Sequence, residues 1–390
     1  MEPSVVGLFA LAGLASLFMA WVIGAGSSGA TPFAPAVGAN AISTMRAAFV
    51  VGILGFAGAV VQGANVSEAV GRGLIGGVSL PAMGVIIVLF IGAGLMAIGI
   101  RTGYPIATAF TVTGAVIGVG LALGGTPVWP KYLQISALWV LTPIVGGGIA
   151  FSIATLLPRP DVPERYSIPL LAALVGAVLA NVEFAYLGPG NTAGSLTGLV
   201  QRTAAADSVV IAAGISLLVA AGIAVAVSWD IRRDMSGGLR HVLLALGSLV
   251  AFSAGGSQVG LAVGPLLPLL DDVGMIPVIA VLFGGGFGIL VGSWTAAPRM
   301  IKSLAQDYSS LGPRRSIAAL VPSFLIAQLA VLLGVPVSFN EIVVSAIIGS
   351  GAAVGGSKAV SARKIGVTVC AWTCSFGIAF VAGYGMAFFL

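Results

Sequence analysis

The chain alternates between long apolar runs and short segments rich in glycine, proline or charged residues. A helix that crosses the hydrocarbon core of a bilayer needs about 20 mostly apolar residues. Only Glu2, and no basic residue, precedes the first run, so we expect a span there and not a signal peptide. The pattern predicts twelve transmembrane helices, at residues 5–23, 46–64, 79–100, 104–124, 134–157, 168–187, 207–229, 241–270, 275–296, 316–333, 335–356 and 365–389.

The composition agrees with this pattern, since 58% of the 390 residues are hydrophobic and only 7% are charged. A typical soluble domain is roughly one quarter charged. So few polar groups would not cover the surface of a soluble fold of this size. The composition therefore excludes a cytosolic enzyme, a nucleic-acid-binding protein and a disordered chain, and it predicts an all-α membrane protein.

The basic residues predict the orientation of the spans, because short cytoplasmic loops carry an excess of lysine and arginine. With the N-terminus outside, the outer loops carry only Arg72, Lys131 and Arg202, and the other 14 of the 17 basic residues face inward. We therefore expect a multi-pass protein of the cell membrane with both termini outside and the basic segment 299–315 in the cytoplasm.

An internal repeat runs through the chain at an offset of 231 residues. The sequence GYPI at 103–106 leads to GAVIG at 114–118, and GVPV at 334–337 leads to SAIIG at 345–349. The same offset relates Gly24 to Gly255, and Gly55 to Gly286. The first copy begins outside and the second inside, so we predict inverted repeats at 1–125 and 241–390, separated by central spans and a cytoplasmic loop at 126–240. Inverted repeats are typical of secondary transporters, and channels also contain them.

Four segments are poorly suited to uninterrupted membrane helices: 24–32, 103–105, 253–260 and 334–336. Glycine and proline loosen or end helices. Irregular backbone at membrane depth is tolerated where it is buried in protein or lines a cavity. A helix that starts there directs its free N–H groups and the positive end of its dipole into the cavity, which favours an anion. We therefore predict broken or re-entrant helices around a central anion site.

Polar side chains lie in or beside these breaks and are the candidate substrate-binding residues: Ser27, Ser28, Thr108, Ser257, Gln258, Ser338 and Asn340. Glu341 lies five residues after Pro336 in a largely apolar span. An intramembrane carboxylate is a candidate functional group, and burial favours its protonated form. Glu341 is therefore a candidate for a coupling proton, with a structural hydrogen bond as the alternative. The sequence offers no metal-ligand cluster and no nucleophile–base pair, so we expect no enzymatic activity.

These segments resemble the signature motifs of the inorganic phosphate transporter (PiT) family. The sequence FSAGGSQVGLAVGPL at 252–266 is similar to that family's FSHGANDVANAIGPL, and IGAGS at 23–27 is a more divergent first copy. GYPIATAF at 103–110 and GVPVSFNE at 334–341 are similar to the GLPVSTTH segment that the family carries in each repeat. The resemblance covers most of the chain and implies the family's fold and anion transport.

Several polar positions of the family motifs differ in this chain. The motif aspartates, which the family uses for sodium binding and coupling to phosphate, fall on Ser27 and Gln258, and the first motif asparagines fall on Gly26 and Ser257. The later asparagine falls on Leu261, and the two histidines fall on Phe110 and Glu341. Sodium thereby loses its carboxylate ligands, although hydroxyl, amide and carbonyl oxygens remain.

We therefore expect a secondary transporter that imports inorganic phosphate by symport with a cation, either sodium or a proton. A sulfate permease on the same scaffold is the alternative substrate class, because phosphate donates a hydrogen bond at neutral pH and sulfate does not. A passive anion channel is the alternative from another class. The expected partners are the oxyanion and the lipid bilayer, with a homodimer left open and no nucleic acid.

Overall fold

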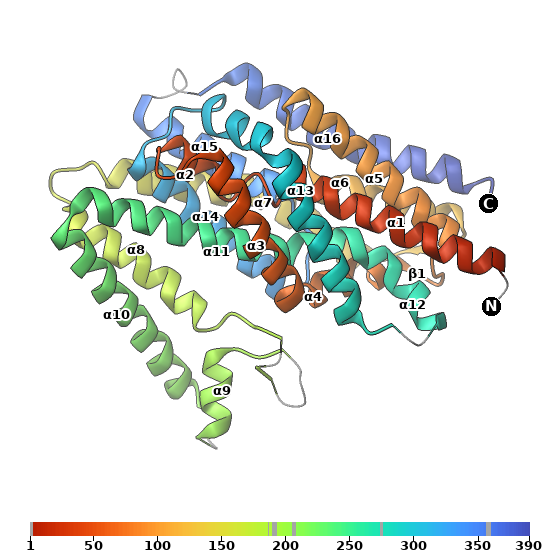
Figure 1. Cartoon of the computed structure of the whole chain (residues 1–390), viewed down its shortest axis with the longest axis horizontal. Helices are drawn as coiled ribbons and strands as arrows, with labels where there is room; N and C mark the ends of the chain where they lie inside the picture. The colour runs from red at the N-terminus through yellow and green to blue at the C-terminus, as the bar shows by residue number, and fades with distance from the viewer. Residues whose placement is uncertain (1–2, 186, 189–192, 205–207, 274–275, 356–359) are drawn as a thin grey trace.

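A computed structural model of the chain describes residues 3–185, 187–188, 193–204, 208–273, 276–355 and 360–390. These residues are almost entirely helical (Figure 1). The elements of the first part of the chain are α1 (Pro3–Gly26), α2 (Ala34–Gly38), α3 (Thr44–Gln62), α4 (Ala64–Arg72), β1 (Ile75–Gly76), α5 (Ala82–Thr102), α6 (Thr108–Ala122), β2 (Thr126–Pro127) and α7 (Trp129–Leu156). Strands β1 and β2 pair in antiparallel fashion.

The middle of the chain contributes helices that lie at one side of the molecule (Figure 1): α8 (Glu164–Leu179), α9 (Leu196–Thr203) and α10 (Val209–Arg233). The remaining helices are α11 (Met235–Val263), a short 3-10 turn (Gly264–Leu266), α12 (Leu267–Val273), α13 (Val278–Gln306), α14 (Pro313–Leu332), α15 (Phe339–Gly355) and α16 (Ala362–Ala387). Helix α10 packs on α8 and turns apolar side chains such as Val209 and Leu218 to the exterior, as a helix in contact with lipid does.

The all-α membrane fold predicted from the hydropathy pattern is confirmed. Nine helices within the described residues are long and apolar enough to cross a membrane, and α6 and α15 are shorter apolar helices. Helix α8 has 16 residues and ends at Leu179, well before the predicted end of its span at 187. The count of twelve spans therefore stays a prediction.

The helix boundaries recur at the offset found in the sequence. Helix α6 begins at Thr108 and α15 at Phe339, which are 231 residues apart, and α5 and α14 precede them at nearly the same offset. Each short helix packs against the long helix that follows the other one, α6 against α16 and α15 against α7. The inverted placement in a membrane and the division of the chain at 125 and 240 stay predictions.

Three of the four predicted breaks are present. Helix α1 ends at Gly26 before a turn that leads into α2, and non-helical segments separate α5 from α6 and α14 from α15. The predicted break at 253–260 is wrong, because α11 continues as an α-helix to Val263.

The reason lies in the packing of α11. A Cβ atom on Gly255 would lie 1.9 Å from the carbonyl oxygen of Gly55 on α3. A continuous helix satisfies its own N–H and C=O groups, and burial of those groups without partners would cost more than the conformational entropy of glycine. These glycines therefore allow close helix packing and do not interrupt the helix. The first part of segment 299–315, which we expected to be a loop, is also helical, because α13 continues through Pro298 to Gln306.

Candidate functional site

Ser27 and Gln258, which are equivalent at the offset of 231 residues, meet in the interior of the molecule. The Ser27 hydroxyl donates a hydrogen bond to Gln258 Oε1 at 3.2 Å. Gln258 Nε2 donates to the carbonyl oxygen of Val337 at 2.7 Å, in the segment between α14 and α15. Both side chains are fully buried. The end of α1, the middle of α11 and the break before α15 therefore converge on one polar cluster.

Asn340 joins the break before α6 to the same cluster. Its Nδ2 donates to the carbonyl oxygen of Gly26 at 3.1 Å and to that of Ile106 at 2.6 Å. Gly26 is the last residue of α1, and Ile106 lies two residues before α6. Asn340 is in the first turn of α15, so the N-termini of the two short helices come together beside the Ser27–Gln258 pair.

Several buried polar atoms around the start of α15 have no hydrogen-bond partner among the described residues. They include Ser338 Oγ and Asn340 Oδ1, while Thr113 Oγ1 on α6 is a further one. Most buried polar groups in proteins are paired. An unpaired hydroxyl and an unpaired amide oxygen beside two helix N-termini indicate a place for a small polar ligand or for water.

The other predicted site residues lie near this cluster and bind mainly within the protein. Thr108 is the first residue of α6, and its hydroxyl contacts Met96 Sδ at 3.4 Å. The Ser28 hydroxyl makes a long contact of 3.5 Å to the carbonyl oxygen of Ile23. Ser257 accepts a long contact, also of 3.5 Å, from Gln258 Nε2. All three are fully buried.

The electrostatics of the cluster come from the backbone, because its predicted side chains are neutral apart from Glu341. The first N–H groups of α6 and α15 have no partner within their helices, and the helix dipole adds partial positive charge there. The Ser338 hydroxyl, which has no hydrogen-bond partner among the described residues, supplies a further donor. This arrangement suits an oxyanion, which accepts several hydrogen bonds at once.

Glu341 lies apart from the hydrogen-bonded cluster. It is 1% exposed and lines a cavity of about 460 Å³ between α7, α15 and α16, together with Phe110, Trp139 and Trp372. Its Oε2 has no hydrogen-bond partner among the described residues. Phe110, the residue at the equivalent position of the first copy, stacks on Trp139 with ring centroids 3.8 Å apart. Glu341 therefore follows Asn340 of the cluster directly in the sequence, but its side chain lies in a separate cavity.

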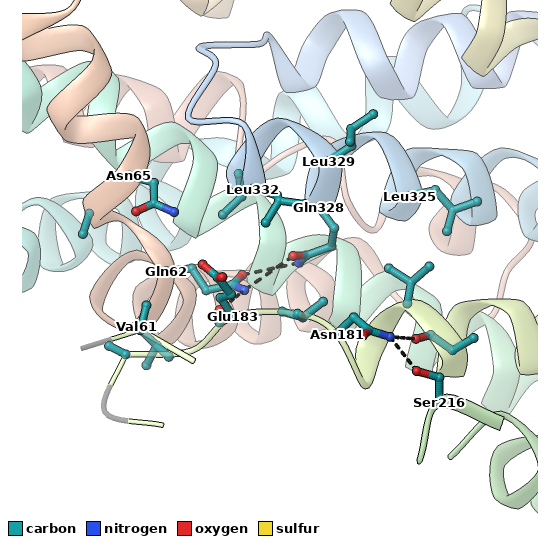
Figure 2. Close-up of a pocket in the computed structure, with 17 residues that line it drawn as sticks. Val61, Gln62, Asn65, Asn181, Glu183, Ser216, Leu325, Gln328, Leu329 and Leu332 are labelled. Atoms are coloured by element: carbon teal, nitrogen blue, oxygen red, sulfur yellow. Dashed lines mark hydrogen bonds between the residues drawn. The ribbon is translucent and has the colours of Figure 1, made fainter. Parts of the chain in front are cut away.

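A second and larger cavity, of about 810 Å³, lies between α3, α8, α10 and α14 (Figure 2). Its walls are mostly apolar, and Gln62 and Gln328 point toward one another across it with their amide groups 3.4 Å apart. Gln328 also donates to the Ser253 hydroxyl on α11 at 2.6 Å. We did not select Gln62 or Gln328 from the sequence, although a glutamine within an apolar span is a signal that would have found them.

The metal-binding capacity of the described part of the chain is limited. It contains no group of three or more His, Cys, Asp or Glu side chains placed to hold a metal ion. Ser27 and Gln258, at the positions of the family's aspartates, offer a hydroxyl and an amide oxygen. A sodium ion bound here would have to use neutral oxygens.

A buried polar cluster between helix ends, enclosed by apolar helices, is the arrangement of a membrane transport protein. The sequence profile of the phosphate transporter family matches residues 23–383. The chain therefore belongs to the phosphate transporter family, as the motif resemblance predicted, and phosphate transport is the activity that this membership supports.

The chain is also similar to individual proteins over nearly its whole length. A protein of Pyrococcus horikoshii named "Putative phosphate permease" is 27% identical, with 93% of this chain and 92% of the relative covered. The "Inorganic phosphate transporter 2-1, chloroplastic" of Arabidopsis thaliana is 25% identical, with 92% and 68% covered. Among solved structures, one described as "The sodium-dependent phosphate transporter" has a TM-score of 0.80 at 23% identity, with 98% of both chains covered. That likeness establishes the fold.

Proposed function

We propose that the protein imports inorganic phosphate across the cell membrane by alternating access and that the polar cluster of Ser27, Gln258 and Asn340 is its anion site. The observation that supports this most is the hydrogen bond between Ser27 and Gln258, two repeat-equivalent residues that bring both copies of the repeat to one point. Substrate sites of repeat-built transporters lie at such interfaces. Among the described residues, the Ser338 hydroxyl has no hydrogen-bond partner and is free to donate to an anion, while the unpaired Asn340 Oδ1 is an acceptor for the hydroxyl of a protonated phosphate.

Ser28, in the turn after α1, Thr108 on α6 and Ser257 on α11 complete the proposed site as hydroxyl donors. Each now makes only a long or a sulfur contact, so each can turn toward a ligand at little cost. A hydroxyl also accepts a hydrogen bond, which phosphate can donate at neutral pH and sulfate cannot. Phosphate is the substrate that the family membership supports, and sulfate is the competitor to measure.

Coupling to a cation is the finer part of the proposal. The solved transporter with the same fold is described as sodium-dependent, whereas this chain has neutral residues where the family carries its aspartates. Glu341 is a buried carboxyl group whose Oε2 has no hydrogen-bond partner among the described residues, and it lines a cavity separate from the anion cluster. We propose that Glu341 carries a coupling proton, and sodium held by neutral oxygens is the alternative.

The test of substrate and coupling is uptake into proteoliposomes. Labelled phosphate and labelled sulfate are compared under an imposed sodium gradient, an imposed proton gradient and no gradient. Phosphate accumulation driven by either gradient supports a symporter. Equal fluxes without accumulation would indicate a channel, and preference for sulfate would indicate a sulfate permease.

A variant separates the role of Glu341 from the rest of the proposal. Glu341→Gln should abolish proton-driven uptake and retain exchange of phosphate for phosphate, because a neutral amide mimics the protonated acid. The matched control is Gln328→Glu, which places a carboxyl group in the other cavity. If proton-driven uptake persists in Glu341→Gln, Glu341 does not carry the coupling proton, but the proposal of phosphate transport still stands.

A further inference from the structure

The non-helical segment before each short helix is bound by the long helix that follows the other short helix, α7 for α15 and α16 for α6. Trp139 Nε1 on α7 donates a hydrogen bond to the carbonyl oxygen of Pro336 at 3.0 Å. Trp372 Nε1 on α16 donates to that of Pro105 at 2.8 Å. Pro105 and Pro336 are equivalent at the offset of 231 residues. The same contact is therefore made twice, once at each short helix.

Each long helix also carries a lysine eight residues before this tryptophan, which is close to its own start. Lys131 Nζ donates to the carbonyl oxygen of Gly334 at 3.0 Å. Lys364 Nζ forms an ion pair with Asp307 at 2.9 Å and contacts Ser303 Oγ at 3.4 Å. The Ser303 hydroxyl lies 3.0 Å from the carbonyl oxygen of Gly103 and 2.8 Å from Asp307 Oδ2, and its single proton is shared between these two acceptors. Lys364 is thereby linked to the first break through one intermediate residue.

Gly103 and Gly334 are the turning points of the two breaks. Both have positive φ angles, +75° and +57°, which the absence of a Cβ atom permits. Five residues after each glycine, the chain enters the short helix that meets the anion cluster. A side chain that binds the carbonyl oxygen of the turning glycine adds a restraint at the start of the break, beside the tryptophan bond two residues later.

The two lysine contacts lie at opposite ends of the molecule. Helix α7 begins directly after β2, which pairs with β1 at the end where both termini lie (Figure 1). Helix α16 ends at the C-terminus and has 26 residues, so its start is about 39 Å away along the helix. The buried anion cluster lies between them. With both contacts formed, Ser27, Gln258 and Asn340 are fully buried.

We propose that Lys131 and Lys364 are gate residues, each of which closes one end of the path to the anion site by holding the break before one short helix. The proposal rests on the proposed transport function. Release of Lys131 frees α15 toward the end where α7 begins, and release of Lys364 frees α6 toward the end where α16 begins. Both are positioning residues, because neither contacts the anion cluster.

The two gates differ in strength. Lys131 binds neutral acceptors, Gly334 O and Gln134 Oε1, whereas Lys364 binds a carboxylate and lies over the ring of Tyr104 at 4.4 Å. Burial opposes the charged form of Asp307, but hydrogen bonds from Lys364 and Ser303 outweigh it and lower the pKa of Asp307. The carboxylate therefore stays charged at neutral pH, and charge-assisted hydrogen bonds are the stronger kind. The gate at Lys364 is the more firmly closed of the two.

One-sided thiol accessibility tests the proposal directly. In a background without Cys370 and Cys374, single reporter cysteines replace Val337 in one break or Ile106 in the other, and an impermeant thiol reagent is added to either face of proteoliposomes. Lys131→Gln should raise labelling at position 337 about three- to tenfold, only from the face where α7 begins. Lys364→Gln and Asp307→Asn should do the same at position 106, only from the opposite face.

The controls distinguish a gate from a general loss of structure. Lys302→Gln removes an exposed lysine from the same end of α13 and should change nothing, and Lys131→Arg and Lys364→Arg should restore slow labelling. If Val337→Cys does not fold, Val335→Cys in the same break replaces it. Equal labelling from both faces, or no change in correctly folded variants, would overturn the proposal. Thiol labelling needs no phosphate flux. One-sided labelling in a protein that transports no phosphate would therefore refute phosphate as the substrate and still support Lys131 and Lys364 as gate residues.

Discussion

Replacement of Gln258 by leucine tests the anion site most directly. Leucine has nearly the same size as glutamine but cannot hydrogen-bond. The variant leaves two buried partners without their bonds, the Ser27 hydroxyl and the carbonyl oxygen of Val337. A buried group left unsatisfied costs about 1–3 kcal/mol, so we expect the free energy of unfolding to fall by about 2–6 kcal/mol.

The functional effect follows from the loss of one hydrogen-bonding group next to the anion. A hydrogen bond to a charged group contributes about 1.5–3 kcal/mol, and each 1.4 kcal/mol corresponds to about a tenfold change in binding. The KM for phosphate should therefore rise at least about tenfold. The matched control is Gln328→Leu, which removes a buried glutamine bonded to Ser253 in the other cavity.

Two measurements are needed on both variants: thermal unfolding in detergent and the KM of phosphate uptake in proteoliposomes. We expect both variants to lose stability and only Gln258→Leu to lose affinity for phosphate. An unchanged KM in a folded Gln258→Leu protein would show that this residue only packs. A similar rise in both variants would show that the effect is one of stability and not of the site.

Two further predictions concern topology and packing. In a cysteine-free background, Ser310→Cys, between α13 and α14, should resist impermeant thiol reagents in intact cells. Thr126→Cys, in β2 at the opposite end of the molecule, should react with them. The reverse pattern would refute the orientation and with it the inverted placement of the repeats. Gly255→Ala should lower the free energy of unfolding by about 1–3 kcal/mol, and with it the unfolding midpoint, because its Cβ would overlap the Gly55 carbonyl oxygen. The control Gly214→Ala meets no atom within 4 Å and should be neutral or stabilising. Equal midpoints for the two variants would contradict the close contact of α11 with α3.

The sequence by itself determined the properties that depend on local composition. Hydropathy over about 20 residues identified the helices of a membrane protein, and most boundaries came out within a few residues. The clear exceptions are the ends of α8 and α13 and both ends of α11. The breaks at Gly103 and Gly334 were also predictable, because a glycine that permits positive φ followed two residues later by a proline disfavours a continuous helix within the segment itself. The repeat offset and the motif order led to the family for the same reason, since both are properties of the linear chain.

Only the tertiary structure decided how the glycines of 253–260 behave. In isolation, the sequence Gly255-Gly256-Ser257 favours a break, yet α11 runs through it because α3 and α4 approach its backbone and leave no room for side chains. The effect of glycine depends on what packs against it, and the chain sequence does not contain that information.

The composition of the site shows the same division. The sequence named the polar residues of the breaks, and the fold decided which of them meet: Ser27, Gln258 and Asn340 converge from α1, α11 and α15, while Glu341, next to Asn340 in the chain, turns into a different cavity. Adjacent residues at the start of a helix point in directions about 100° apart, so neighbours in sequence face different surroundings. Partners 231 or 314 residues apart come together only because the two copies of the repeat pack around a common centre.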